Sequence, residues 1–312
     1  MSNESSYLNK LIESGAFHFA KLSISEIDNG PIYERSGNHM AREEICLFHR
    51  DMDSGDDYTR ILDDVLRQSI LSKRAMPIVR FADGEYAFYN FDLSCNGLYR
   101  QAESVKAIRS IMPVHINALK NLAAQGRFAP LIFPENSGQH QTGMLSLLRR
   151  WKKIPSAVTF LDLLFRAGIE LTKSNYIPFY AVYAYLTSGD FARLLNDLKI
   201  CIINPESNQI ACASWFEQFS SHPEISFVDI PDAYIATRWP MIKESILEEI
   251  PQDTSLCLVG AGIGALLVCV DVAQHLSIPT IDAGHVLNMM NDRVDKSNGM
   301  RLYTIRKAAI QD

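Results

Sequence analysis

Two acidic residues flank a glycine in the segment Arg80-Phe-Ala-Asp83-Gly84-Glu85, which directly follows an apolar run. Carboxylates at this spacing can turn towards one point, and a hard divalent cation prefers oxygen ligands of this kind. Such a cation takes one or two carboxylates from the protein and completes its shell with water and substrate phosphates. We therefore predict that Asp83 and Glu85 bind Mn²⁺ or Mg²⁺. Arg80 and Gly84 are assigned to the same ligand site, Arg80 through a charge-assisted contact to phosphate. The structural alternative is an Asp-Gly turn whose acids are solvated.

The glycine-rich segment Gly260-Ala-Gly262-Ile-Gly264-Ala follows a second apolar run. Its spacing fits the dinucleotide fingerprint in the variant that ends in alanine, and Asp282 falls about where the ribose-binding acid is expected. An NAD(P)-dependent oxidoreductase is therefore an alternative function. That fingerprint normally opens a nucleotide-binding unit, however, and only 312 − 282 = 30 residues follow Asp282. A close-packed turn between a strand and a helix, whose free N–H groups bind part of a nucleotide, explains the glycines equally well.

His285 and Glu206 are two further side chains with catalytic potential. His285 lies just after a predicted strand that ends near Asp282, and Glu206 follows the apolar run of residues 199–203. Either one is a candidate general base, because each is expected at the sheet edge where ligands bind and a substrate hydroxyl can be reached. A lone histidine also often has a purely structural role, and the sequence leaves this open.

The elements that must position these residues alternate along the chain. Apolar periodicity and apolar runs separate helices from strands. The predicted strands are residues 76–81, 128–133, 199–203, 226–230, 255–259 and 279–281. The predicted helices are residues 56–71, 102–122, 211–220, 240–249 and 264–275, and residues 143–196 are mostly helical with an extended break at 176–179. This alternation predicts a Rossmann-like, doubly wound α/β fold with a mainly parallel sheet.

The composition excludes several classes of protein. The chain has 312 residues, with 30 basic and 36 acidic side chains, so its formal charge is −6. A general nucleic-acid binder needs a basic surface, so nucleic acid is not an expected partner. No secretory signal and no transmembrane segment is recognisable in the sequence. We therefore expect a cytoplasmic protein, either free or attached peripherally at the inner face of the membrane. The sequence predicts no oligomeric state.

Two segments about 200 residues apart carry a family resemblance. They are Arg80-Phe-Ala82-Asp83-Gly84-Glu85 and Thr280-Ile-Asp282-Ala-Gly284-His285. In this order they resemble the bacterial glycosyltransferases of the GT-D fold, also known as domain of unknown function 1792. That family has R-F-G-D-G-E near its start and a segment like A-I-D-I-G-H near its end, so Ala82 replaces a glycine here. The resemblance spans roughly residues 56–290 and includes a central strand that ends near Glu206.

The resemblance implies a metal-dependent glycosyltransferase. The donor would be a nucleotide-sugar, a UDP-sugar in the first instance, with Asp83 and Glu85 holding a divalent metal on its diphosphate. The acceptor would be a glycan, a lipid-linked sugar or a glycoprotein. Residues 56–312 would form this GT-D-like domain, and residues 1–55 a partly helical N-terminal extension. A non-catalytic nucleotide-binding protein that keeps the fold is a further alternative.

Overall fold

The computed structural model describes residues 6–22, 45–96, 100–137 and 156–291. At its centre lies a six-stranded sheet in the order β4-β3-β8-β7-β5-β6. Its strands are β3 (Met76–Phe81), β4 (Arg127–Pro130), β5 (Lys199–Asn204), β6 (Glu224–Asp229), β7 (Leu256–Val259) and β8 (Pro279–Asp282). Every neighbouring pair is parallel. All six carboxyl ends therefore lie at one edge of the sheet.

The inner strands of this sheet are buried almost throughout. Every residue of β3, β7 and β8 is buried, and in β5 only Lys199 is exposed. Continuous apolar runs of this kind are typical of parallel strands that are covered on both faces. Strand β6 lies at one edge of the sheet, and there only Val228 is buried. The apolar runs in the sequence therefore mark the centre of the sheet.

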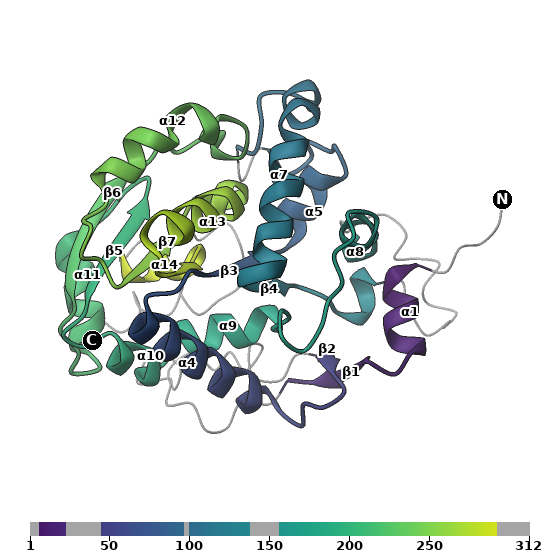
Figure 1. The fold of residues 1–312 in the computed structure, drawn as a ribbon, viewed down its shortest axis with the longest axis horizontal. Coiled ribbons are helices and arrows are strands. Elements are labelled where there is room, and N and C mark those ends of the chain that lie inside the picture. The colour runs from purple at the N-terminus through teal and green to yellow at the C-terminus, as the bar shows by residue number, and fades with distance from the viewer. Residues whose placement is uncertain (1–5, 23–44, 97–99, 138–155, 292–312) are drawn as a thin grey trace, which may run out of the picture.

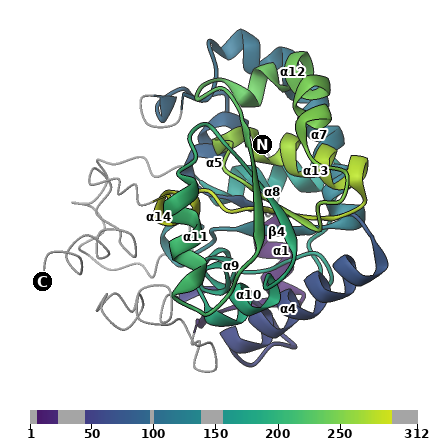
Figure 2. The ribbon, with the colours of Figure 1, turned by 90° about the vertical axis from the view of Figure 1, so that its left-hand side faces the viewer.

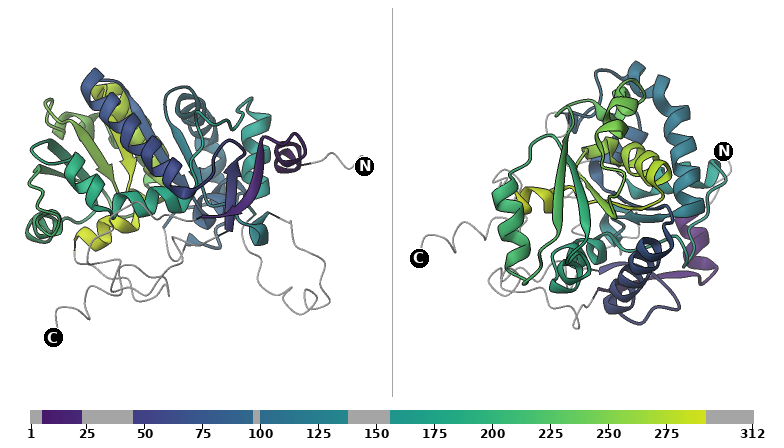
Figure 3. Two further views of the ribbon diagram at one scale, coloured as in Figure 1. Left: turned by 90° about the horizontal axis from the view of Figure 1, so that it is seen from below. Right: turned by 60° about the vertical axis from the view of Figure 1, so that its left-hand side comes forward.

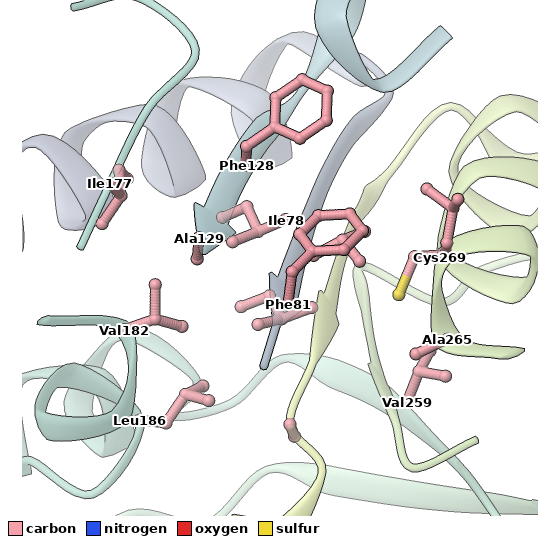
Figure 4. Packing of buried hydrophobic residues seen from close by; sticks show 14 of the residues in the cluster. Ile78, Phe81, Phe128, Ala129, Ile177, Val182, Leu186, Val259, Ala265 and Cys269 are labelled. Carbon is pink, nitrogen blue, oxygen red and sulfur yellow. The ribbon is translucent and has the colours of Figure 1, made fainter. Parts of the chain in front are cut away.

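Helices cover both faces of the sheet (Figures 1 and 2). On one face, α13 (Ala265–Leu276) contacts β3, β7 and β8 and lies beside α7 (Val105–Gln125) and α12 (Ile235–Glu249). On the other face, α4 (Gly55–Ser72) contacts β3 and β8 and lies beside α9 (Phe179–Leu186) and α10 (Gly189–Leu194). Figure 4 shows side chains of α9 and α13 packed with those of β3, β4 and β7. The predicted doubly wound α/β fold with a parallel sheet is confirmed.

Three short helices begin close to the carboxyl edge of the sheet. Helix α5 (Asp83–Tyr89) follows β3, α11 (Gln209–Glu217) follows β5, and α14 (His285–Met290) follows β8. Helix α11 packs against α14, and α5 packs against α8 (Ala157–Arg166). The segments that carry the predicted chemistry are therefore helix starts at one edge of the sheet.

The described part of residues 1–55 packs beside β4, at the end of the molecule away from β6 (Figure 3). It consists of α1 (Tyr7–Glu13) and an antiparallel pair, β1 (Phe17–Lys21) with β2 (Ile45–His49). The backbone N–H of Tyr7 donates to Asp162 Oδ1 at 2.8 Å, and the Tyr176 hydroxyl donates to the Leu47 carbonyl at 2.5 Å. The apolar side chains of this segment belong to the same core as those of the sheet.

Some element boundaries differ from the sequence prediction. Strand β4 ends at Pro130, not at residue 133, because its partner β3 ends at Phe81, which pairs with Pro130. Helix α12 begins at Ile235, five residues before the predicted start at Pro240. The extended break predicted at residues 176–179 is confirmed at Tyr176, which forms a parallel bridge with Phe128, but Phe179 already begins α9. Part of the predicted helical region, residues 143–155, lies outside the described residues. Within the described ranges, no helix is both long enough and apolar enough to cross a bilayer.

Candidate active site

A cavity of about 280 Å³ opens at the carboxyl edge of the sheet. Its lining comes from the segments that follow β3, β5, β6, β7 and β8. All the site residues expected from the sequence line it, and they are Arg80, Asp83, Gly84, Glu85, Glu206, Gly260, Gly262, Gly264, Asp282 and His285. The fold thus gathers in one place residues that the sequence separates by up to about 200 positions.

The topology of the sheet explains why the cavity lies here. Strands β5 and β7 are neighbours, but the chain leaves β5 towards β6 and leaves β7 towards β8, in the opposite direction. The loops after these two strands therefore diverge, and ligands of open α/β sheets bind in the crevice at such a switch point. Glu206 follows β5, and Gly260 to Gly264 follow β7.

Arg80 and Asp282 join the two motifs directly. The Arg80 backbone N–H donates to Asp282 Oδ2 at 3.2 Å, and Arg80 Nη2 donates to Asp282 Oδ1 at 3.2 Å. Arg80 Nε also donates to the Asp282 carbonyl at 2.8 Å. Both residues are buried, and burial raises the pKa of Asp282 in spite of the opposing guanidinium charge. Arg80 Nη1 is buried without a hydrogen-bond partner among the described residues, and the residue lines the cavity.

Gly284 makes this pairing sterically possible. Its backbone has φ +42°, a region that L-residues with a side chain rarely adopt. A Cβ atom at this position would lie 1.8 Å from Arg80 Nη2. The glycine of the second motif therefore provides the space that the arginine of the first motif occupies.

Asp83 and Glu85 lie in the first turn of α5, so the alternative of an isolated Asp-Gly turn is wrong. Asp83 is exposed at the start of the helix, whereas Glu85 is half-buried. Glu85 Oε2 accepts a hydrogen bond from the Ala82 backbone N–H at 2.8 Å, which caps the helix. Burial, together with the negative charges of Asp282 and Asp83, raises the pKa of Glu85 to about 8.

The donor set of the cavity fits a divalent cation that shares its coordination with a ligand. No cluster of three or more histidine, cysteine, aspartate or glutamate ligands occurs among the described residues. A cage made by protein side chains alone is therefore not present in that part of the chain. Two carboxylates in one helical turn match the one or two that Mg²⁺ or Mn²⁺ takes beside substrate phosphates. The donor set therefore fits a divalent cation, and the assignment of Asp83 and Glu85 as its ligands stays a prediction.

The three glycines after β7 have different structural roles. A Cβ on Gly260 would lie 2.3 Å from Asn204 Oδ1, and a Cβ on Gly264 would lie 2.3 Å from Ile235 Cγ2. These two glycines permit close packing against the segments after β5 and β6. Gly262, with φ +52°, would place a Cβ in open space. The turn therefore combines close packing with backbone that is exposed at the cavity.

The dinucleotide alternative is not favoured by this arrangement. In a dinucleotide site the acidic residue after the next strand hydrogen-bonds the ribose. Both carboxylate oxygens of Asp282 instead accept hydrogen bonds from Arg80. Asp282 therefore holds Arg80 in position.

Glu206 and His285 reach the cavity from two further segments. Glu206 is exposed, and its backbone carbonyl accepts hydrogen bonds from the side-chain amides of Asn204 and Asn291. His285 is half-buried at the start of α14, and its Nδ1 lies 3.5 Å from Asn288 Nδ2. Glu206 is therefore an exposed acidic residue in the lining of the cavity.

Several cavity residues belong to no motif that the sequence analysis used. Gln101 is buried, and its Nε2 donates to the Gly84 carbonyl at 2.6 Å. Gln101 Oε1 has no hydrogen-bond partner in the described part of the chain. The ring of Phe179 lies 5.1 Å from the Arg80 guanidinium carbon, and Tyr234 lines the cavity at the start of α12. No local sequence signal identified Gln101 or Tyr234, because only the packing of distant segments brings them to the cavity.

These features define a parallel α/β protein with an acidic ligand cavity at the switch point of its sheet. The sequence matches no protein-family model and no curated protein. Among solved structures, a glycosyltransferase (DUF1792) from Streptococcus sanguinis aligns at 15% identity and a TM-score of 0.44, over 72% of this chain and 81% of that one. A domain of unknown function 1792 described as having a distinct glycosyltransferase fold aligns at 15% identity and a TM-score of 0.39, over 75% of this chain and 83% of that one.

Proposed function

We propose that the protein is a metal-dependent glycosyltransferase that moves a sugar from a nucleotide-sugar, a UDP-sugar in the first instance, to an acceptor hydroxyl. The observation that carries this proposal is the cavity in which Asp83 and Glu85, the Arg80–Asp282 pair and the Gly260–Gly264 turn meet. The resemblance of the two motifs to GT-D glycosyltransferases supports the same function.

The charges of the cavity support a requirement for metal. Its charged lining residues comprise five acids, Asp83, Glu85, Glu206, Asp232 and Asp282, and two arginines, Arg80 and Arg100. Asp282 pairs with Arg80, and Asp232 pairs with Arg100 at 2.6 Å. The lining therefore has an excess of negative charge, which repels a diphosphate. A divalent cation on Asp83 and Glu85 would cancel the charge of these two carboxylates where the phosphates are expected.

The residues of the chain have separate roles in this proposal. When bound, the cation supplies positive charge that stabilises the departing nucleoside diphosphate. Arg80 presents its unpartnered Nη1 to a phosphate oxygen, and the backbone at Gly262 approaches the nucleotide closely. Glu206 and His285 are the candidate groups to take the proton from the acceptor hydroxyl. The acceptor classes remain those implied by the resemblance, namely a glycan, a lipid-linked sugar or a glycoprotein.

A thermal-shift panel tests the proposal. The full chain is heated with UDP, with UDP-sugars and with NAD(H), each with and without Mn²⁺, because a ligand that binds only the native state stabilises it. We expect stabilisation by UDP and UDP-sugars that depends on Mn²⁺, followed by release of UDP from a UDP-sugar during turnover. Stabilisation by NAD(H) alone would overturn the proposal in favour of an oxidoreductase. Stabilisation by UDP without turnover of any donor would indicate a non-catalytic nucleotide-binding protein.

A further inference from the structure

Tyr234 adopts an unusual backbone conformation at the wall of the cavity. It immediately precedes α12 and has φ 64° and ψ 21°, in the left-handed region. Non-glycine residues seldom occupy this region, and such outliers concentrate at functional sites. Tyr234 is half-buried and lines the cavity. A residue with an uncommon backbone conformation therefore lies at the wall of the cavity.

Hydrogen bonds from two segments hold Tyr234 in this conformation. Its backbone N–H donates to the Arg100 carbonyl at 2.9 Å, and Arg100 is itself left-handed, with φ 43°. The Tyr234 carbonyl accepts from the Arg238 backbone N–H at 2.9 Å in the first turn of α12. Glu103 accepts hydrogen bonds from the side chains of Thr237 and Arg238 and so fastens α12 to the segment before α7. The backbone at Tyr234 is therefore fixed before any ligand binds.

A cation covers one face of the Tyr234 ring. The Arg238 guanidinium lies over the ring, with its carbon 5.0 Å from the ring centroid. Arg238 is exposed and does not line the cavity, whereas Tyr234 does. Arg238 therefore occupies one face of the Tyr234 ring and leaves the other face for a ligand.

The next residue places this ring beside the glycine turn. Ile235 packs so closely on Gly264 that a Cβ there would lie 2.3 Å from Ile235 Cγ2. Gly264 ends the turn at which the diphosphate is expected. Arg100 and Asp232 line the same part of the cavity and offer a donor and an acceptor close to Tyr234 in the structure. A flat group with polar edges, attached to a diphosphate, matches these surroundings.

We propose that Tyr234 is the platform on which the nucleobase of the donor stacks, and that it thereby determines affinity for a nucleoside diphosphate over a diphosphate alone. This inference rests on the proposed function and assigns a specificity residue within it. Base–aromatic stacking contributes about 1–3 kcal/mol per base. Loss of the ring is therefore expected to weaken binding by about 5- to 150-fold.

The test compares Tyr234→Asn with Tyr234→Phe in the full chain. Asparagine tolerates the left-handed conformation but has no ring, and phenylalanine keeps the ring without its hydroxyl. Dissociation constants for UDP and for inorganic pyrophosphate are measured by calorimetry with Mn²⁺ present, and thermal denaturation verifies folding. We expect Tyr234→Asn to weaken UDP binding at least 5-fold and to leave pyrophosphate binding unchanged. Tyr234→Phe is expected to remain within 2-fold of wild type for both.

Three outcomes would overturn this assignment, and they are distinguishable from one another. Equal UDP affinity in wild type and Tyr234→Asn would refute the stacking role while leaving the proposed function intact. Equal weakening of UDP and pyrophosphate binding would show that Tyr234 acts through the shape of the cavity. Failure of the wild-type chain to bind either ligand would refute the proposed function and this inference with it.

Discussion

His115 occupies the hydrogen-bonding place that Pro240 leaves empty in helix α12. Proline has no N–H, so Pro240 cannot donate to the carbonyl four residues earlier, which belongs to Ala236. His115 Nε2 lies 2.8 Å from that carbonyl, and its Nδ1 lies 3.0 Å from the Tyr89 hydroxyl. We therefore assign the proton to Nε2, with Nδ1 accepting from Tyr89. The buried imidazole links α5 to α12, two elements that line the cavity.

This link predicts a loss of stability in mild acid. Burial lowers the pKa of His115 from 6.5 to about 4 in the folded chain, so the unfolded chain binds the proton first as the pH falls. The stability that neutral His115 gives the folded chain is complete above pH 6.5, and it is lost progressively as the pH falls towards about 4. A shift of this size corresponds to about 3 kcal/mol.

Urea denaturation of wild type and His115→Gln between pH 4 and pH 7.5 measures this effect. Glutamine can donate to Ala236 and accept from Tyr89 but does not titrate in this range. From pH 7.5 to pH 4, the unfolding free energy of wild type is expected to fall by about 3 kcal/mol relative to that of His115→Gln. A pH-independent difference would refute the account.

Removing one partner of the buried Arg80–Asp282 pair is expected to lower the free energy of unfolding much more than removing one partner of an exposed ion pair. Asp282→Ala leaves a buried guanidinium without its counter-ion, which we expect to cost about 3–5 kcal/mol of unfolding free energy. Asp232→Ala removes the partner of Arg100 from an exposed pair, which we expect to cost less than about 1 kcal/mol. Urea midpoints of both variants provide the comparison. Similar values would show that burial does not distinguish the two pairs.

Gly284→Ala is expected to impair ligand binding by displacing Arg80. The added methyl group would lie 1.8 Å from Arg80 Nη2, so the guanidinium must move. Gly168→Ala is the matched control, because Gly168 also has a positive φ, +76°, but would place a Cβ in open space. Both variants place a side chain at a positive φ, so both incur backbone strain. Only Gly284→Ala should also weaken UDP binding, and equal binding by both variants would contradict the role of Arg80.

The acidic pair of α5 predicts a loss of metal-dependent transfer. Asp83→Ala is expected to lower sugar transfer by about 100-fold or more and to abolish Mn²⁺ binding measured by calorimetry. Glu85→Gln removes the negative charge of the side chain but keeps the helix cap, because the glutamine oxygen can still accept a hydrogen bond from the Ala82 N–H. It should therefore lose metal but unfold at a similar temperature to wild type. Asp64→Ala, at an exposed position on α4, serves as the control. Transfer by Asp83→Ala near the wild-type rate would refute the metal assignment.

The sequence determined much of the sheet and the position of the motifs. Residues 76–81 are predicted and observed as β3, and the predicted strand at 199–203 becomes β5 with one more residue. These strands can be predicted from the sequence because parallel strands covered on both faces need continuous apolar runs. Both motifs begin in the last residues of such strands and continue beyond them, so their place at one edge of the sheet follows from the strand pattern alone.

The tertiary structure decided which of these residues act together. The sequence cannot show that Arg80 binds Asp282, because the two are 202 positions apart and meet only when β3 pairs with β8. The sequence also could not place the start of α12 before Pro240. The proline leaves the Ala236 carbonyl without its helical partner, and His115, 121 residues away in the sequence, takes that place. Tyr234 likewise lies at the cavity because its segment packs against a distant one, where its backbone N–H donates to the Arg100 carbonyl. Local patterns specify the elements, whereas buried polar groups find their partners only when distant segments pack together.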